Sequence, residues 1–245
     1  MKTLIIIPTY NEIESLPRQV DGVRDVAPDA HILVVDDGSP DGTGEWADGR
    51  ATIDDHVFVM HRAAKQGLGA AYLAAFSWAL ERDYGVVIEM DADGSHRAQD
   101  LPKILAQAEN HDLVIGSRWI PGGTVVNWPA HRKFLSTNAN RYVRLALGVP
   151  IRDATAGFRS YRAPILRKLA LAQVESQGYC FQIDMAWRVM LAGGTVSEVP
   201  ITFVERNAGA SKMSGAIIRE ALAKVTWWGI QRVFGGRRGA RRQDA

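Results

Sequence analysis

Short apolar, β-branched runs alternate with longer segments of helical spacing over the first 120 residues. The runs are TLIII (3–7), HILVVD (31–36), HVFVMH (56–61), YGVVIEM (84–90) and DLVIGS (112–117). Between them lie segments such as EIESLPRQVDGVRDV (12–26) and GLGAAYLAAFSWALERD (67–83), whose apolar residues recur at helical intervals. This alternation predicts an α/β protein with a mostly parallel, Rossmann-like central sheet and helices on both faces.

The pattern changes after residue 120. A loop rich in Gly, Pro and Trp, PGGTVVNWPAHRK (121–133), leads into a predicted helix near 131–147. The segments that follow are a turn-rich DATAGFRSYR (153–162), a helix around 181–192, a strand in TVSEVPITFVER (195–206) and a polar loop NAGASKMSG (207–215). We find no internal repeat and no low-complexity segment, so the chain does not indicate a repeat architecture.

Polar segments follow several of the predicted strands. They are PTYNE (8–12), DDGSPDGT (36–43), DADGSH (91–96) and SRW (117–119). In open parallel sheets, ligands bind beyond the carboxyl ends of the strands. These four segments are therefore the place where a binding or catalytic site is expected.

The segment PTYNE allows two interpretations. Pro8 and Asn11 can simply shape a turn, with Glu12 stabilising the start of the next helix through the helix dipole. Alternatively, Tyr10 offers a flat face to a nucleobase while Glu12 accepts hydrogen bonds from it. Taken alone, the segment favours the structural interpretation.

The pair Asp36-Asp37 in ILVVDDG is similar to the acidic pocket of a phosphoacceptor receiver domain. Receivers carry that pair after their first strand, however, and here a complete strand and helix come before it. Asp41 and Thr43 are plausible capping residues for the next helix. An aspartate at a strand end with a glycine turn behind it also suits recognition of a ribose hydroxyl.

The segment Asp91-Ala92-Asp93 is either a solvated acidic turn or a metal site. In extended chain, side chains two residues apart project to the same side, so both carboxylates can converge on one hard cation. Mg²⁺ or Mn²⁺ held in this way keeps open positions for substrate phosphates. Ser95 and His96 could add a ligand or a supporting contact, although His96 alone is better explained by packing or hydrogen bonding.

Basic residues in or next to the predicted loops are candidates for phosphate contacts. They are Arg118, Arg132, Arg159, Arg206 and Lys212. A guanidinium group matches phosphate oxygens at two points, so a site that handles phosphates needs such groups. Any one of them taken alone is more simply a solvated surface residue.

Composition and charge narrow the class of protein. The 245 residues are 47% hydrophobic and include a single cysteine, Cys180, so the chain can bury a full core but cannot form an internal disulfide. No uncharged run approaches the roughly 20 apolar residues of a membrane-spanning helix, and the start lacks a signal-peptide pattern. We therefore expect a cytoplasmic protein.

The net charge of +2 is unevenly distributed. Residues 206–245 hold nine Lys and Arg against two Asp and Glu, a net of +7, which leaves residues 1–205 at −5. A basic tail of this kind meets a phosphate-rich partner, either an anionic membrane surface or a nucleic acid. The chain contains no recognition helix and no interleaving of aromatic and basic residues typical of nucleic-acid readers, so we expect no nucleic acid as partner.

Taken together and in order, these motifs resemble those of family 2 glycosyltransferases with a GT-A fold, and more narrowly the polyprenol-phosphate (dolichol-phosphate) mannose synthases. The segments that carry the resemblance are PTYNE, DDGSPDGT, MDADGSH, GSRW, NWPAHRK, DATAGFRSYR and ERNAGASKMS. The resemblance runs from about residue 3 to residue 214, and its most family-specific part is Glu205–Ser214. It implies a GT-A catalytic domain over residues 1–214, followed by a C-terminal amphipathic helix and basic tail over residues 215–245.

The resemblance also implies roles for individual residues. Those expected to hold the nucleobase or nucleoside of the donor are Pro8, Tyr10, Glu12, Val34, Asp36, Asp37, Asp91 and Ala92. Asp91 and Asp93 match metal-binding aspartates, with Ser95 as a third possible ligand. The expected catalytic residues are Asp93, Arg118 and Arg132 facing the donor and acceptor phosphates, and Arg206 and Lys212 on a loop that closes over the donor.

The reaction implied is transfer of mannose from GDP-mannose to a polyprenyl phosphate, with inversion, supported by Mg²⁺ or Mn²⁺. A phosphate acceptor, with a second pKa of about 6, needs positioning more than deprotonation. If the acceptor were a hydroxyl, Asp153 and Asp184 would be the candidate bases. The alternatives are a glucosyltransferase using UDP-glucose, a family 2 enzyme acting on a saccharide hydroxyl, and a non-catalytic nucleotide-sugar binding module.

Because the implied acceptor is a lipid, we expect the C-terminal segment to contact a membrane. In residues 215–234, Ile218, Leu222, Val225 and Trp228 recur at helical spacing, and we expect Ile218 and Leu222 to dock on the domain. For Trp227, Trp228 and four later arginines we expect contact with an anionic membrane surface. Those arginines are Arg237, Arg238, Arg241 and Arg242. The enzyme would be attached peripherally to the cytoplasmic face, and a separate membrane-anchoring protein is a candidate partner.

Overall fold

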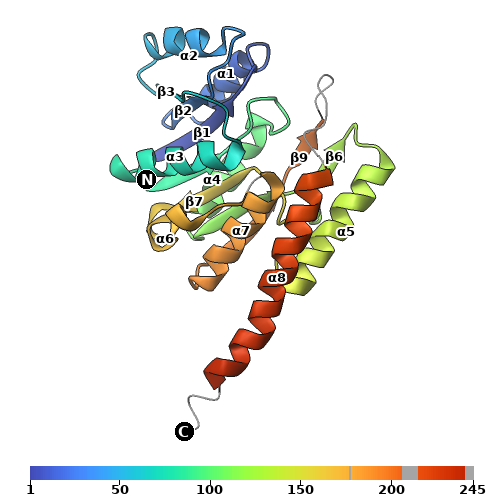
Figure 1. Ribbon diagram of the computed structural model, residues 1–245. Coiled ribbons are helices and arrows are strands. Elements are labelled where there is room, and N and C mark those ends of the chain that lie inside the picture. Colours follow the sequence, from blue (N-terminus) through green and yellow to red (C-terminus); the bar gives the residue numbers. More distant parts are fainter. Residues whose placement is uncertain (177, 206–214, 241–245) are drawn as a thin grey trace.

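The computed structural model describes residues 1–176, 178–205 and 215–240. Within these residues, seven strands form the central sheet: β1 (Thr3–Thr9), β2 (His31–Asp36), β3 (Val57–His61), β4 (Val86–Glu89), β5 (Leu113–Ser117), β7 (Arg159–Arg162) and β8 (Val196–Pro200). Their order across the sheet is β3-β2-β1-β4-β7-β5-β8 (Figure 1). Strand β7 runs antiparallel to β4 and β5, and the other pairs are parallel. The prediction of a mostly parallel α/β sheet is confirmed.

Helices cover both faces of this sheet. They are α1 (Leu16–Val26), α2 (Thr43–Ala51), α3 (Leu68–Glu81), α4 (Leu101–Ala108), α5 (Ala130–Leu147), α6 (Ala163–Lys168), α7 (Gly178–Leu191) and α8 (Gly215–Ala240), with short 3₁₀ turns at Ala98–Asp100 and Leu171–Gln173. Side chains alternate between the two faces along each strand. In β1, Ile5 and Ile7 pack toward α1, α2 and α4, whereas Leu4 and Ile6 pack toward α3, α6 and α7.

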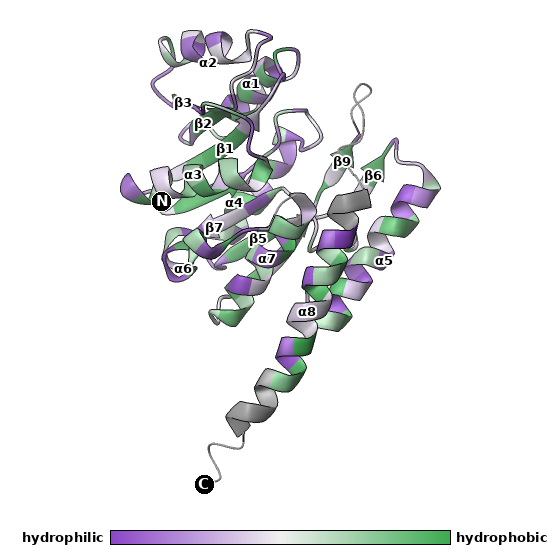
Figure 2. Cartoon of the chain, viewed as in Figure 1, coloured by the Kyte–Doolittle hydropathy of each residue, from purple (hydrophilic) through white to green (hydrophobic). Residues whose placement is uncertain are grey.

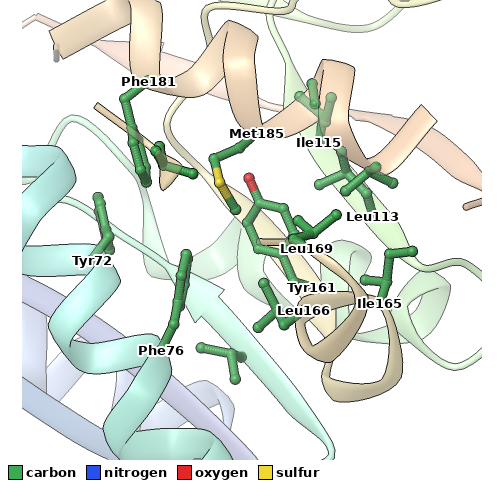
Figure 3. Close-up of a cluster of buried hydrophobic side chains, with 14 of the residues drawn as sticks. Tyr72, Phe76, Leu113, Ile115, Tyr161, Ile165, Leu166, Leu169, Phe181 and Met185 are labelled. Atoms are coloured by element: carbon green, nitrogen blue, oxygen red, sulfur yellow. The ribbon is translucent and has the colours of Figure 1, made fainter. Parts of the chain in front are cut away.

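The larger of the two cores is rich in aromatic residues. Figure 3 shows Tyr72 and Phe76 of α3 facing Phe181 and Met185 of α7, with Tyr161 of β7 beneath them. The rings of Tyr72 and Phe181 stack with centroids 6.2 Å apart, and those of Phe76 and Tyr161 meet edge to face at 5.5 Å. Each buried side chain of this size stabilises the fold by roughly 1.5–3 kcal/mol. The sheet edge that carries the polar loops is therefore held rigidly.

Strand β7 lies where the sequence predicts only turns. Its first residue, Arg159, is fully buried in the middle of the sheet because its guanidinium is satisfied by main-chain oxygens. Nε donates to Ala156 O at 2.6 Å, Nη1 to Gln182 O at 2.6 Å and Nη2 to Ala154 O at 2.7 Å. Arg159 is thus a structural residue, and its candidacy as a phosphate ligand is wrong in this structure.

The segment TVSEVPITFVER forms two strands instead of the single strand predicted. Strand β8 joins the central sheet, whereas β9 (Thr202–Val204) pairs in parallel with β6 (Thr124–Val126) in a separate two-stranded sheet. Ile201, between the two strands, is fully buried. The small sheet lies beside the carboxyl end of the main one, because His96 pairs with Phe203 of β9 across an isolated bridge.

Helix α8 lies alongside α5 and continues past it, away from the sheet (Figure 1). Val225 is buried in the contact, Tyr142 Oη and Thr226 Oγ1 are 2.7 Å apart, and a Cβ on Gly229 would come within 3.0 Å of Ala146 O. In the part of the chain that the structure describes, no helix has the length and apolar character needed to cross a membrane.

The predicted docking of Ile218 and Leu222 on the domain is confirmed for neither residue. Leu222 is 48% exposed, and the side chain of Ile218 lies outside the described residues. Of the tryptophan pair, Trp228 packs against the core, whereas Trp227 is 58% exposed. Figure 2 shows apolar and polar residues mixed along α8 rather than in one continuous apolar stripe. The side chains of the four terminal arginines also lie outside the described residues.

Candidate active site

The loops after β1 and β2 are joined by hydrogen bonds from the main chain of one to the side chains of the other. Asn11 N donates to Ser39 Oγ at 3.0 Å, Glu12 N to Thr43 Oγ1 at 3.0 Å and Ile13 N to Asp41 Oδ2 at 3.2 Å. Asp41 and Thr43 therefore connect loops rather than only capping α2, where Gly42 occupies the cap position without a side-chain bond. The predicted convergence of these two loops at one sheet edge is confirmed.

Tyr10 and Glu12 lie in the loop after β1, as expected. The Lys65 ammonium sits 3.9 Å from the centre of the Tyr10 ring, so one ring face is already covered by a cation. The Glu12 carboxylate accepts a hydrogen bond from Ser15 Oγ at 2.9 Å at the start of α1. Both side chains are half-buried beside Pro8, and their role toward a nucleobase stays a prediction.

Asp36 and Asp37, after β2, are bound by the protein itself. Asp36 Oδ1 accepts from Ser39 Oγ at 2.5 Å, and Oδ2 accepts from the main-chain N–H of Ser39 at 3.1 Å. Asp37 pairs with Arg62 at 2.7 Å, while burial raises the pKa of the Asp37 carboxyl against the opposing effect of Arg62. Val34 is fully buried in β2, so its predicted contact with the nucleoside has no exposed surface to act through.

The acidic segment after β4 is a turn and not the extended chain on which the argument from spacing relied. Gly94 has a positive φ of 76°, and the Ser95 N–H donates to Asp93 Oδ1 at 2.9 Å. Asp91 and Asp93 are both half-exposed, whereas Ala92 between them is buried. The turn places the two carboxylates at the edge of the sheet together with the other loops.

The oxygens in this turn fit a hard divalent cation. Ser95 Oγ is buried and has no hydrogen-bond partner among the described residues, next to two carboxylates that reach the surface. Within those residues no group of three or more His, Cys, Asp or Glu gathers as a complete ligand set. A cation here would therefore be held by two carboxylates and a hydroxyl, with substrate oxygens completing its shell.

His96 stabilises the acidic turn through a hydrogen bond to the main chain of Asp91. Its Nδ1 accepts the Asp91 N–H at 3.0 Å, and its Nε2 lies 3.7 Å from Asp91 Oδ2. The buried ring stacks on Phe158 with centroids 5.0 Å apart and meets Phe203 edge-on at 5.7 Å. The sequence interpretation of His96 as a packing and hydrogen-bonding residue is confirmed, and the structure shows that its hydrogen-bond partner is Asp91.

Glu89 is buried directly beneath the acidic turn. Burial raises the pKa of its carboxyl to about 8, with the Asp91 charge adding to the effect and Arg159 and Gln182 opposing it. Gln182 Nε2 donates to Glu89 Oε2 at 2.9 Å. At neutral pH this carboxyl is therefore mostly protonated and adds little negative charge behind Asp91 and Asp93.

Arg118, after β5, is buried and paired with Asp153 at two points. Nε donates to Asp153 Oδ2 at 2.7 Å, Nη2 donates to Asp153 Oδ1 at 2.7 Å, and Nη2 also reaches Thr155 Oγ1 at 2.9 Å. Burial lowers the pKa of Arg118, but the charges and hydrogen bonds of Asp153, with Asp91 also contributing, raise it overall. Asp153 is thus committed to Arg118 and is not available as a base.

Arg132, at the start of α5, forms an ion pair with Glu205, and its guanidinium lies 4.2 Å from the centre of the Trp128 ring. Glu205 is the last described residue before the segment that carries Arg206 and Lys212, both of which lie outside the described residues.

The other suspected base, Asp184, is buried and bound to Arg188 and Ser176, each at 2.7 Å. It is therefore no more available as a base than Asp153.

Arg118 and Arg132 both line a pocket of about 300 Å³, called here the acceptor pocket after the ligand proposed for it below. Its walls come from α5, α7 and α8, and most of them are apolar. The other lining residues are Trp128, Leu135, Ser136, Asn138, Ala139, Tyr142, Val143, Thr155, Tyr179, Ile183, Ala221, Leu222 and Val225. A ligand with an anionic head and an apolar tail matches this distribution of charge and apolar surface.

Several residues of this site carry no local signal in the sequence. Thr155 and Tyr179 line the pocket, whereas Asp153, which the sequence offered only as a candidate base, binds Arg118 without lining the pocket. Lys65 beside Tyr10 follows no recognisable motif. Arg118 and Arg132, by contrast, were predicted, and the structure brings them together.

The open α/β sheet with an acidic turn after β4 has the fold of the GT-A glycosyltransferases. Residues 4–170 match "Glycosyl transferase family 2", and the chain belongs to that family.

Two curated relatives extend along nearly the whole chain. The undecaprenyl-phosphate mannosyltransferase of Micrococcus luteus is 55% identical over 230 residues, which are 94% of this chain and 95% of the relative. The polyprenol monophosphomannose synthase of Mycolicibacterium smegmatis is 58% identical over 232 residues, which are 94% of this chain and 88% of the relative. The predicted resemblance to polyprenol-phosphate mannose synthases is confirmed at this level.

Solved structures agree on the fold. The glucosyl-3-phosphoglycerate synthase of Mycobacterium tuberculosis, in complex with Mn²⁺, uridine diphosphate and phosphoglyceric acid, superposes with a TM-score of 0.69. The match covers 93% of this chain and 78% of that chain at 17% identity. At that identity the likeness is one of fold, and the metal and nucleotide are those of the neighbour.

Proposed function

We propose that this chain transfers mannose from GDP-mannose to the phosphate of a polyprenyl phosphate, with inversion, giving a polyprenyl β-mannosyl phosphate and GDP. The observation that carries the proposal is the acceptor pocket, a mostly apolar cavity whose lining includes Arg118 and Arg132. A polyprenyl phosphate has the matching layout, a charged head on a long apolar chain. Both curated relatives are named for mannose transfer to such a lipid.

The chemistry suits a phosphate acceptor because the two carboxylates suspected as bases, Asp153 and Asp184, are both bound by other side chains. Asp153 is buried and accepts from Arg118 at both carboxylate oxygens, so neither oxygen is open to an acceptor hydroxyl. A phosphate monoester is already largely dianionic at neutral pH. One of its oxygens would attack the anomeric carbon of the donor, and the carbon–oxygen bond to the diphosphate would break, leaving the electron pair on GDP. The arginines would orient the attacking phosphate and reduce repulsion between the two substrates.

Asp91, Asp93 and Ser95 would hold Mg²⁺ or Mn²⁺. When bound, such a cation neutralises negative charge that grows on the leaving diphosphate. Arg206 and Lys212 would add positive charge over the donor, and the residues around Tyr10 and Asp36 would hold its nucleoside. The protein's own contribution is to fix the acidic turn through His96 and to keep Glu89 largely uncharged beneath it.

The lipid acceptor requires the enzyme to reach a membrane surface, and we place it peripherally on the cytoplasmic face. Large apolar side chains that are exposed on α8 support this placement. They are Leu222, Trp227, Ile230, Val233 and Phe234. Aromatic and aliphatic residues on one helix, followed by basic residues, are typical of interfacial attachment. A separate membrane-anchoring protein remains part of the proposal.

A donor panel tests the reaction. The purified protein would be incubated with undecaprenyl phosphate and labelled GDP-mannose, UDP-glucose or GDP-glucose, with Mg²⁺, Mn²⁺ or EDTA, and label in the lipid phase measured. We expect transfer from GDP-mannose with metal only. Transfer from UDP-glucose but not from GDP-mannose would replace the proposal by its runner-up, a polyprenol-phosphate glucosyltransferase.

Filling the acceptor pocket tests the assignment of the lipid site. Ala139 lines this pocket from α5, and Ala139→Trp should raise the acceptor KM by at least tenfold while leaving donor binding intact. Leu191→Trp, at a 67% exposed position of α7 outside the pocket, is the control and should transfer normally. Equal acceptor KM values in the two variants would remove the pocket from the proposal.

Replacing the carboxylates tests whether the chain is a catalyst or only a binding module. Asp91→Asn and Asp93→Asn keep the shape of the turn but remove negative charge, so we expect metal-dependent transfer to fall by at least a hundredfold. A parent protein that binds GDP-mannose but never transfers label would favour the binding module.

A further inference from the structure

A second pocket lies on another side of α5. It has a volume of about 290 Å³ and is called here the arginine pocket. Its lining residues are Trp119, Thr137, Asn140, Arg141, Arg144 and Arg152. Its α5 residues recur at intervals of three, one and three, as on a single helix face, and this face is distinct from the one that lines the acceptor pocket.

The three guanidinium groups of the arginine pocket are not neutralised by the protein. Among the described residues, Arg141, Arg144 and Arg152 form no ion pair or hydrogen bond through their side chains, and no acidic residue lines the pocket. Helix α5 contains no Asp or Glu over its 18 residues. All three residues are exposed, so water screens the repulsion between them, while an anion bound in the pocket would be attracted by three positive charges at once.

Two buried polar atoms in the same lining also lack partners among the described residues. They are Trp119 Nε1 and Asn140 Oδ1. Asn140 is buried, and its Nδ2 is committed to Ser136 O at 3.0 Å and Thr155 Oγ1 at 3.1 Å. Buried polar groups in folded proteins are normally satisfied, so unsatisfied ones indicate a missing partner. The indole N–H is a donor that suits a phosphate oxygen, and the amide oxygen is an acceptor that suits a hydroxyl.

Apolar side chains on the same side of α5 indicate where the anion comes from. Phe134 and Leu145 are 72% and 68% exposed, and they lie seven residues before and four residues after Arg141, on the same helix face. Exposed apolar residues beside unpaired arginines are typical of a surface that lies in the headgroup layer of a membrane. A soluble anion would not require them.

We propose that the arginine pocket binds the headgroup of an anionic glycerophospholipid, with its phosphate on the arginines and Trp119 Nε1 and a headgroup hydroxyl on Asn140 Oδ1. This site is separate from the acceptor pocket and does not depend on the reaction proposed above. Its occupation would hold α5 against the membrane while the other side of the helix faces the acceptor.

Vesicle binding tests the proposal on the full chain, without donor or acceptor. The triple variant Arg141→Gln/Arg144→Gln/Arg152→Gln would be compared with the parent by co-sedimentation with vesicles of phosphatidylglycerol in phosphatidylcholine and of phosphatidylcholine alone. We expect the triple variant to lose about fivefold in affinity for the anionic vesicles per arginine. Binding to neutral vesicles should be weak and similar in both proteins. Unchanged binding to anionic vesicles would overturn the proposal.

A charge-matched control separates the pocket from net charge. Arg18→Gln/Arg82→Gln/Lys168→Gln removes the same charge from α1, the end of α3 and α6, away from the pocket. This control should bind anionic vesicles nearly as well as the parent. An equal loss of affinity for anionic vesicles in both triple variants would show that only overall charge matters and would overturn the proposal that the arginine pocket binds a headgroup.

The indole N–H of Trp119 reports on the headgroup directly. In a ¹⁵N-labelled sample the seven tryptophans give separate indole signals, and Trp119→Phe identifies the one concerned. Soluble short-chain phosphatidylglycerol should shift that signal in the parent but not in the pocket triple variant. No shift, or an equal shift with inorganic phosphate at the same concentration, would overturn the lipid headgroup as the ligand. Mannosyl transfer to a water-soluble polyprenyl phosphate should persist in the pocket triple variant, so this test and that of the proposed function can fail separately.

Discussion

The Arg118 guanidinium and the Asp153 carboxylate meet at two points, with both N–O distances at 2.7 Å, and the Arg118 main-chain N–H adds a third contact to Asp153 at 2.9 Å. The carboxylate is fully buried, and the arginine reaches the acceptor pocket. Asp153 therefore fixes the direction in which the positive charge of Arg118 faces a ligand. This pair would therefore preorganise Arg118 for the phosphate contact proposed for it.

Replacing Asp153 should separate acceptor binding from donor binding. Asp153→Asn keeps the volume but can accept from Arg118 at only one point, so we expect the acceptor KM to rise by about tenfold and the donor KM to change less than twofold. Breaking a buried pair costs about 3–5 kcal/mol of stability, which a domain of ordinary stability can lose without unfolding. Initial rates with varied acceptor and chemical denaturation would measure both effects.

A milder variant distinguishes a loss of acceptor binding from simple unfolding. Thr155→Val removes the Thr155 hydroxyl contacts to Arg118, Asn140 and Asp153 but leaves the Arg118–Asp153 pair in place, and we expect a two- to threefold rise in acceptor KM with a smaller loss of stability than in Asp153→Asn. A loss of stability in Asp153→Asn with an unchanged acceptor KM would show that the pair is structural only.

His96 should control metal binding through the main chain of Asp91. His96→Ala removes the acceptor of the Asp91 N–H, and we expect Mn²⁺ affinity to fall by about 10- to 100-fold, as for other residues that orient metal ligands. His96→Asn should retain most of the affinity, because its amide oxygen can accept the same N–H. Electron paramagnetic resonance of free Mn²⁺ measures this without any turnover. Equal Mn²⁺ affinities in the parent and His96→Ala would contradict the role.

The central sheet is predictable from sequence because most of its strands are continuous apolar runs buried on both faces. Strand β7 was missed for the opposite reason, since Arg159 looks like a surface residue and is buried only because three main-chain oxygens from other segments accept its N–H groups. Similarly, Ile201 reads as part of one strand but marks the point where the chain leaves the central sheet for the small one. Both errors arise where tertiary contacts override a local pattern.

The sequence predicts those residues of the candidate site that lie at strand ends or in recognisable motifs. Asp91, Asp93 and Arg118 could be placed because parallel strands end at one edge of a sheet, whereas Arg132, at the start of α5, came from the family resemblance of NWPAHRK. The residues that bind Arg118 could not be predicted, because the contacts of Asp153 and Thr155 to Arg118 are set by packing rather than by spacing in sequence. The acceptor pocket depends in turn on how α8 docks on α5, which helical periodicity alone leaves open.

The sole cysteine should be chemically silent in the folded protein. Cys180 is fully buried in α7, and burial raises the pKa of its thiol to about 12. At pH 8 only about one molecule in ten thousand would carry the reactive thiolate. We expect Ellman's reagent to modify no thiol within an hour under native conditions and one thiol per chain in urea. Rapid native modification would mean that α7 opens readily, and Cys180→Ser provides the blank.

Glu89 should make the folded state less stable at high pH. Its folded pKa of about 8 lies above the ordinary glutamate value of 4.5, so the folded state binds the proton more tightly than the unfolded state does. The stability that this adds is complete below pH 4.5 and is lost as the pH rises through 8. Between pH 6 and pH 9 the parent should lose roughly 2 to 3 kcal/mol more than Glu89→Gln, whose amide can still accept from Gln182. Urea denaturation at both pH values in EDTA measures the difference, and other titrating groups cancel because both proteins contain them. Parallel stability curves would mean that Glu89 is ionised in the folded protein near neutral pH, and that a full negative charge lies beneath Asp91 and Asp93.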